Sequence, residues 1–261
     1  MDNKLTREFN IWEGIYGSFH DTGSDAIGPG FGGDIYRTRA LNVAHECLAA
    51  VNTGRPIPSF YKQRSTLLAP VAAMMLESKV PLRILYFGGG LGIGYMALCE
   101  SILYHSGAID YTIVEIPEVC ETGRELLSRR EIAYLDSLPS QGEFDLVHSA
   151  SALQYIEDWQ QALKSLSGYG AEYILLSDVF AGSIPTFVTL QNYYGSRIRH
   201  WFLNFEELLE LISSLGYQLV MKSFVNARRL GAEDILPMEN FPASHRLEQS
   251  LHLLFRLRRD S

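Results

Sequence analysis

The stretch Leu82-Arg83-Ile84-Leu85-Tyr86-Phe87-Gly88-Gly89-Gly90-Leu91-Gly92-Ile93-Gly94-Tyr95 decides the fold. It begins as an apolar run of β-branched and aromatic residues, breaks into alternating glycines and continues with a helical pattern. This order predicts a buried strand, a tight loop and the N-terminus of a helix. The glycines permit positive φ angles and leave the loop without Cβ atoms, so a nucleoside can approach the main chain.

The spacing of these glycines separates one kind of nucleotide-binding loop from another. A G-x-G-x-x-G dinucleotide fingerprint needs glycine or alanine at position 93 or 95, where the chain has Ile93 and Tyr95. No G-K-[ST] follows, so a phosphate-binding P-loop is excluded. The G-x-G-x-G spacing resembles the loop after the first strand of class I S-adenosylmethionine (SAM) methyltransferases; the alternative is that the glycines only pack a helix against a strand. The resemblance implies that the cofactor contacts Phe87, Gly88, Gly89, Gly90 and Gly92.

A second strand that ends in an acid supports nucleoside binding. Residues 111–114 form an apolar run that leads into Glu115, and Ile116 and Pro117 then open a helix. In nucleoside-binding α/β folds, an acid about 20 residues beyond a glycine loop accepts hydrogen bonds from ribose hydroxyls. We therefore expect Glu115 to hold the ribose, with Ile116 beside it in the cofactor site.

Two later strand ends complete the predicted cofactor site. Asp136 follows a short strand over 132–135, where methyltransferases commonly place an acid for the adenine amino group; the alternative is a turn aspartate. Ser151 and Gln154 follow a strand over 144–149, at the carboxyl end where open α/β sheets bind ligands. This last stretch resembles the F-D-L-V-x(5)-L-x-x-I run of class I methyltransferases, which implies that it lines the methyl donor.

Taken together, these patterns predict an α/β fold with a Rossmann-like seven-stranded methyltransferase sheet. The sheet is expected to be mostly parallel, with an antiparallel C-terminal hairpin over 217–225 and 251–258. Residues 1–78 are expected to form an N-terminal arm and helical cap, and residues 79–261 the SAM-binding methyltransferase core.

Within the N-terminal part, aromatic residues and glycines without periodicity predict an irregular arm over 9–33. Two helices are expected to follow, over 35–51 and 59–77, and Pro70 is a candidate to kink or divide the second. Such a cap covers the cofactor cleft in many small-molecule methyltransferases; the alternative is packing alone.

The segment 179–201 follows the fifth strand and Asp178, and it is rich in hydroxyl and aromatic side chains. A loop of this length in a compact domain is usually functional, so we interpret it as the acceptor-binding lid. His200 in this segment is the candidate general base for an alcohol acceptor, and Asp178 and Tyr193 are the other candidates. A hydrogen-bonded structural histidine is the alternative interpretation of His200. No tight cluster of Asp, Asn and His predicts a metal site.

Composition limits the class of partner. A formal net charge of −8 and a pI near 5.4 argue against nucleic acid, which favours a basic surface, and leave a small-molecule acceptor. Cys47, Cys99 and Cys120 lie far apart without C-x-x-C spacing, so neither disulfides nor zinc are indicated. No apolar run suits a signal peptide or a membrane span, and we expect a cytoplasmic protein. Whether the chain forms a homodimer through the cap is left open by the sequence.

The chain also resembles a narrower family of bacterial proteins assigned as methyltransferases and often encoded among surface-polysaccharide genes. This resemblance extends over most of the length and rests on 12–16, 87–92, 115–123, Leu153-Gln154-Tyr155, Thr189-Leu190-Gln191, Trp201-Phe202 and 215–217. The family usually has an aspartate where this chain has Tyr86, and Arg-x-Pro where it has Val179-Phe180-Ala181. The first departure removes an acid near the amino acid end of the donor, and the second alters the acceptor side.

The leading hypothesis is therefore a SAM-dependent O-methyltransferase that acts on a sugar or another hydroxylated small metabolite, with S-adenosylhomocysteine as product. The absence of an N-P-P-Y stretch disfavours methylation of a base or amide nitrogen. An N- or C-methyltransferase of the same fold and a non-catalytic SAM- or nucleoside-binding partner subunit are the alternatives. A nicotinamide-dependent oxidoreductase is more distant, because the glycine spacing is wrong.

Overall fold

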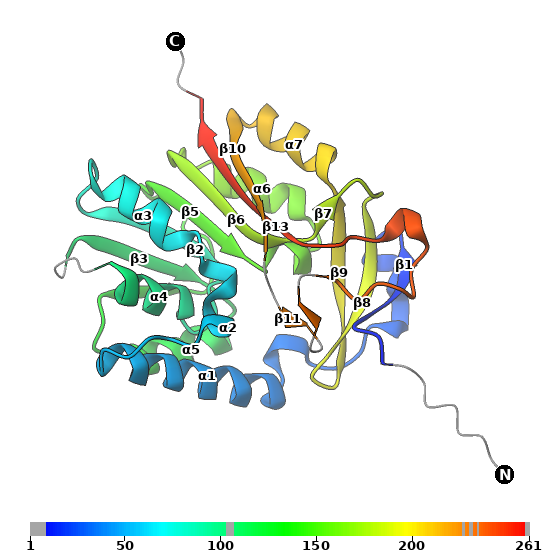
Figure 1. Ribbon diagram of the computed structural model, residues 1–261, viewed down its shortest axis with the longest axis horizontal. Coiled ribbons are helices and arrows are strands. Elements are labelled where there is room, and N and C mark those ends of the chain that lie inside the picture. Colours follow the sequence, from blue (N-terminus) through cyan, green and yellow to red (C-terminus); the bar gives the residue numbers. More distant parts are fainter. Residues whose placement is uncertain (1–8, 103–106, 226–227, 230–231, 234, 259–261) are drawn as a thin grey trace.

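The strands expected from the sequence form one seven-stranded sheet (Figure 1). The computed structural model describes residues 9–102, 107–225, 228–229, 232–233 and 235–258. The strands of this sheet are β2 (Leu82–Phe87), β3 (Ile109–Val114), β4 (Ile132–Leu135), β5 (Leu146–Ala150), β6 (Tyr173–Val179), β10 (Tyr217–Phe224) and β13 (Leu251–Leu257). Their order is β10-β13-β6-β5-β2-β3-β4, and β13 runs antiparallel to both β6 and β10 while the other neighbours are parallel. The predicted fold class is confirmed.

Helices pack against the two faces of this sheet. One buried apolar cluster joins it to α1 (Asp34–Asn52), α3 (Leu68–Leu76), α4 (Ile93–Ser101) and α5 (Pro117–Leu126). A second cluster joins the opposite face to α6 (Trp159–Ser167) and α7 (Phe205–Ser214). Side-chain caps fix the start of the last two helices, because Asp158 accepts from the Gln161 amide at 2.8 Å and Asn204 accepts from the Glu207 amide at 3.0 Å.

The expected helix over 59–77 is divided. It consists of α2 (Ser59–Lys62), a 3-10 turn (Gln63–Ser65) and α3. The interruption precedes α3, and Pro70 lies in the first turn of that helix, where proline removes no intrahelical hydrogen bond. The division therefore occurs before Pro70 and not at it.

A second sheet corrects the expectation of an irregular arm and a long lid loop. It contains β1 (Trp12–Tyr16), β7 (Ala181–Gly182), β8 (Phe187–Tyr193) and β9 (Ser196–Asn204) in the order β1-β8-β9-β7. Figure 1 shows the N-terminal strand β1 beside β8, far from it in sequence. Tyr194 and Gly195 have φ angles of 46° and 79° and join β8 to β9 in a two-residue hairpin turn. Most of the predicted loop is therefore regular strand.

This second sheet follows directly from the carboxyl end of the main sheet. After β6 the chain passes through Phe180 into β7, and the Leu203 amide on β9 donates to the Phe180 carbonyl at 2.8 Å. A third apolar cluster, which includes Trp12, Phe202 and Phe241, lies against the second sheet. A short ladder of β11 (Arg228–Arg229) and β12 (Ala232–Glu233) lies in the connection from β10 to β13.

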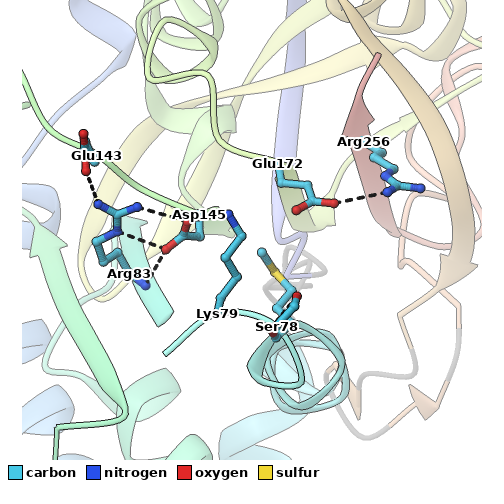
Figure 2. Close-up of polar contacts among 8 residues, drawn as sticks. Ser78, Lys79, Arg83, Glu143, Asp145, Glu172 and Arg256 are labelled. Carbon is cyan, nitrogen blue, oxygen red and sulfur yellow. Dashed lines mark hydrogen bonds and ion pairs between the residues drawn. The ribbon is translucent and has the colours of Figure 1, made fainter. Parts of the chain in front are cut away.

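The opposite, amino end of the parallel strands carries a group of ion pairs (Figure 2). Arg83 at the start of β2 places its Nε 3.1 Å from an Asp145 carboxylate oxygen, and Lys79 Nζ lies 3.4 Å from the other oxygen. Burial alone raises the pKa of Asp145, but the hydrogen bonds from Arg83 outweigh it and hold this pKa below its usual value. These contacts tie β2 to the residue before β5, away from the glycine loop.

Candidate functional site

The glycine loop between β2 and α4 has the expected conformation. Gly88, Gly90 and Gly92 have φ angles of 72°, 55° and 80°, which L side chains rarely adopt. A Cβ atom on Gly88 would lie only 2.2 Å from the Cβ of Ala152, whereas one on Gly90 would meet no described atom within 4 Å. Gly88 is thus required by packing, while Gly90 borders open space where a ligand can reach the main chain.

Glu115 lies against this loop from the end of β3. The Gly90 amide donates to its Oε1 at 3.0 Å, and the Ile116 amide donates to its Oε2 at 3.0 Å. Burial raises the pKa of Glu115 above its usual value, and these two hydrogen bonds act against that rise. The structure therefore brings Glu115, Ile116 and the glycine loop together, as the sequence predicts.

Asp136 lies at the same edge, one residue beyond β4. The Glu115 amide donates to the Leu135 carbonyl at 3.0 Å, so the ends of β3 and β4 are held side by side. Asp136 is exposed, and the Ser137 hydroxyl donates to it at 3.3 Å. Its carboxylate is accessible from solvent, and its role towards adenine stays a prediction.

A pocket of about 410 Å³ lies where β5 and β6 end and the second sheet begins. Four residues singled out from the sequence line it, namely Ser151, Gln154, Asp178 and Tyr193. Burial raises the pKa of Tyr193 well above its usual value, so its phenol stays protonated and can donate a hydrogen bond into the pocket.

Asp178 forms the polar floor of this pocket. Its side chain is 1 % exposed and pairs with Arg64, whose Nε lies 3.1 Å from Oδ2. The Ser250 hydroxyl donates to Oδ1 at 2.5 Å, and the Ser151 hydroxyl donates to Oδ2. A buried carboxylate needs such compensation, because its charge has been removed from water. Asp178 is thus a fixed structural acid, and accepting a proton from an acceptor would require it to give up these partners.

His200 lies behind the pocket and not among the residues that line it. Its side chain is 0 % exposed, and its ring centroid lies 5.3 Å from that of Tyr155 and 4.7 Å from that of Phe180, both of which line the pocket. The rings of Trp12 and Phe202 also pack against it. Since a general base must reach the acceptor hydroxyl directly or through one water, this burial favours a packing role. Proton transfer by His200 stays a prediction.

Tyr86, the departure noted in the sequence, packs beneath the glycine loop. Its ring is the nearest contact of a Cβ atom built on Gly94, at 2.6 Å, and it lies 4.3 Å from the His148 ring. Burial raises the pKa of Tyr86 to about 12, and the Ser65 hydroxyl hydrogen-bonds to its phenol. A neutral side chain therefore stands in the position of the acid.

Several residues that line the pocket were not predicted as site residues from the sequence. Arg64 lines the pocket from the turn between α2 and α3, and Trp12 and Gln191 line it from the second sheet. The Tyr155 hydroxyl donates to Gln191 Oε1 at 2.8 Å, which joins the end of the main sheet to β8. For Trp12 and Gln191 there was a signal, because both lie in segments on which the family resemblance rests. A single arginine between two cap helices carried no such signal.

No metal-binding cluster occurs among the described residues. Within the same part of the chain, no helix combines the length and apolarity that crossing a membrane requires.

No protein-family profile and no curated protein matches the sequence. Among solved structures, an uncharacterized protein from Burkholderia thailandensis superposes with a TM-score of 0.53 at 13% identity, over 84% of this chain and 93% of its own. The complex between the Haloferax volcanii Trm112 methyltransferase activator and a proposed methyltransferase matches with a TM-score of 0.51 at 15% identity, over 82% and 96%. Burkholderia thailandensis 1,6-didemethyltoxoflavin-N1-methyltransferase, with S-adenosylhomocysteine bound, reaches 0.48 at 15% identity, over 90% and 94%. At these identities the first two likenesses establish a shared fold.

Proposed function

We propose that this protein is a SAM-dependent methyltransferase that acts on an oxygen of a small acceptor, a sugar or another hydroxylated metabolite. The observation that carries the proposal is the pairing of Glu115 with the Gly90 amide beside open space, next to a pocket at the carboxyl ends of β5 and β6. The fold shared with proteins that include a proposed methyltransferase supports it.

The residues present fit this cofactor. The space that a Cβ on Gly90 would occupy is free. Glu115 accepts from two amides and keeps further carboxylate lone pairs for ribose hydroxyls. When bound, SAM supplies an electrophilic methyl group on a sulfonium leaving group. The protein's part is to hold the acceptor in line with that group and to exclude water, which can supply much of the acceleration.

On the acceptor side, the pocket combines aromatic walls with hydrogen-bonding side chains. Tyr193 offers a protonated phenol, and the Tyr155 and Gln191 pair lies beside it. Asp178 is held by Arg64 and two serine hydroxyls, so its carboxylate fixes the positions of these polar groups at the pocket. We propose that Tyr193 positions the acceptor and that alignment, rather than a strong base, provides most of the catalysis.

Calorimetric titration with SAM, S-adenosylhomocysteine and NAD tests the cofactor assignment. We expect both sulfur nucleosides to bind and NAD to fail. Glu115→Ala should abolish that binding, because the ribose loses its acceptor. Glu118→Ala is the matched control, since Glu118 is an exposed acid in the first turn of α5, and it should bind like the wild type. Equal affinity of the Glu115 and Glu118 variants, or no binding to the wild type, would contradict the proposal.

A further inference from the structure

Arg64 is presented to the pocket by a short, anchored segment. It belongs to the 3-10 turn between α2 and α3, and the next residue, Ser65, is buried and hydrogen-bonds to the phenol of Tyr86. The turn is therefore fixed to the strand beneath the glycine loop. Arg64 itself points outward into the pocket, and its side chain is 53 % exposed.

The ion pair with Asp178 leaves most of this guanidinium available. Asp178 is 1 % exposed and also receives hydrogen bonds from Ser151 and Ser250, so its charge is compensated by groups fixed in the fold. Arg64 contacts it through Nε. Within the described residues, no hydrogen bond engages the two terminal nitrogens of Arg64. A planar fork of N–H donors thus faces the pocket.

The charge of the pocket selects the kind of group that this fork can bind. Among the described residues that line it, Arg64 is the only cation and Asp178 the only acid, and most of the rest are aromatic, apolar or amide side chains. A phosphate dianion would meet a pair that is already neutral overall. A planar carboxylate matches the fork in geometry and adds one negative charge to that pair instead of two, and the low polarity of the walls strengthens its two hydrogen bonds.

We propose that Arg64 is a carboxylate-binding residue of this pocket. The carboxylate can come from the amino acid end of the methyl donor or from the acceptor. The first source rests on the proposed function, whereas binding of a free carboxylate compound does not. Tyr86 then has a positioning role, because it hydrogen-bonds to Ser65 in the turn that carries Arg64.

The test measures binding by calorimetry with two pairs of probes. S-adenosylhomocysteine and 5′-methylthioadenosine differ by the amino acid end of the donor. 4-Hydroxybenzoate and its methyl ester differ by a carboxylate on an aromatic ring, which suits the walls formed by Tyr155, Phe180 and Tyr193. The variant is Arg64→Met, and Arg64→Lys keeps the charge but loses the fork.

Arg83→Met is a closely matched control. Arg83 also pairs through Nε with a buried aspartate at 3.1 Å, and its side chain is 36 % exposed, but it lies at the amino end of the sheet (Figure 2). Because Arg64→Met leaves Asp178 without its cation, the double variant Arg64→Met/Asp178→Asn is measured as well. In the double variant both charges of the pair are removed, so no unpaired carboxylate is left buried. Thermal unfolding of each variant shows whether the single variant folds poorly and the double variant is needed.

A donor source predicts that Arg64→Met weakens S-adenosylhomocysteine about 10- to 100-fold and 5′-methylthioadenosine hardly at all. An acceptor source predicts the same loss for 4-hydroxybenzoate but not for its ester. In both cases Arg64→Lys is intermediate and Arg83→Met resembles the wild type. The inference is overturned if, within each probe pair, the ratio of the two affinities is the same for the Arg64 variants as for the wild type. If the wild type binds no S-adenosylhomocysteine but shows Arg64-dependent binding of 4-hydroxybenzoate, the proposed function fails and this inference stands.

Discussion

Gly88 and Gly90 have similar backbone conformations but different surroundings. At both positions alanine would occupy a left-handed conformation, which costs roughly 1–2 kcal/mol. At Gly88 its methyl group would also overlap Ala152, only 2.2 Å away, while at Gly90 it would enter open space beside the amide that Glu115 binds.

We therefore predict that Gly88→Ala loses more unfolding free energy than Gly90→Ala, and that Gly90→Ala folds but binds S-adenosylhomocysteine weakly. Urea unfolding and calorimetry measure the two effects. The packing argument would be refuted by equal stability of the two variants, and the ligand argument by wild-type affinity in Gly90→Ala.

The raised pKa of Glu115 predicts how binding depends on pH. Ribose hydroxyls donate to the ionised carboxylate, so affinity should fall as the pH drops through the pKa of the free protein, which lies above the usual value of about 4.3. The effect on folding has the opposite sign, because a raised folded-state pKa means that ionisation costs stability as the pH rises through that window.

Calorimetric titrations with S-adenosylhomocysteine across this pH range measure the effect. Glu115→Gln keeps the shape of the side chain but cannot ionise, so its weaker affinity should be nearly constant with pH. A wild-type and a Glu115→Gln protein with parallel pH profiles would show that another group is responsible.

At the scale of elements, β9 shows how a strand can resemble a catalytic loop. Residues 197–201 read as a polar and aromatic run, yet they pair with β8, and His200 lies opposite Thr189. The inward ring of His200 then fills space between the second sheet and the pocket wall, in contact with Tyr155 and Phe180.

This packing predicts that His200→Ala lowers the unfolding free energy by about 3 kcal/mol, as expected when a buried ring leaves a cavity. His200→Phe should restore most of that stability, and we expect turnover to return with it. Thermal unfolding and methyl transfer to a found acceptor are measured on both variants. A stable His200→Phe enzyme without turnover would instead establish the proton-transfer role considered from the sequence.

The elements that could be predicted are those whose signals are local. The run from Leu82 to Tyr95 predicts a strand, a loop and a helix from adjacent residues. Asp158 and Asn204 likewise indicate helix starts, because each is a capping residue directly before a helical pattern. The second sheet depends on pairing between β1 and β8, which are separated by most of the chain, so neither strand has a partner nearby in sequence. The Tyr194-Gly195 turn was the one local sign of a hairpin that the composition of the segment obscured.

On the scale of the whole molecule, the predicted donor and acceptor regions draw on different parts of the chain. The glycine loop and Glu115 belong to a continuous stretch of parallel strands and helices. The pocket is lined partly by the ends of β5 and β6 in that same stretch, and in addition by β1, by the turn at Arg64 and by β8. Trp12 on β1 is 1 % exposed and contacts the rings of Phe180 and Phe202, so it links the N-terminal strand to the segment after β6 and to β9.

Trp12→Ala should therefore separate the two regions. Removing this ring is expected to cost about 3–5 kcal/mol of unfolding free energy and to disturb the acceptor pocket. Among the described residues, no ring contact or hydrogen bond joins Trp12 to the glycine loop or to Glu115. S-adenosylhomocysteine at 100 times its dissociation constant should therefore still stabilise the variant by about 2.7 kcal/mol, as in the wild type. Urea unfolding with and without the ligand gives both numbers, and Glu115→Ala is the control that should lose the ligand effect while keeping the tryptophan. If the ligand no longer stabilises Trp12→Ala, the second sheet is needed for donor binding too, and the two regions form one site.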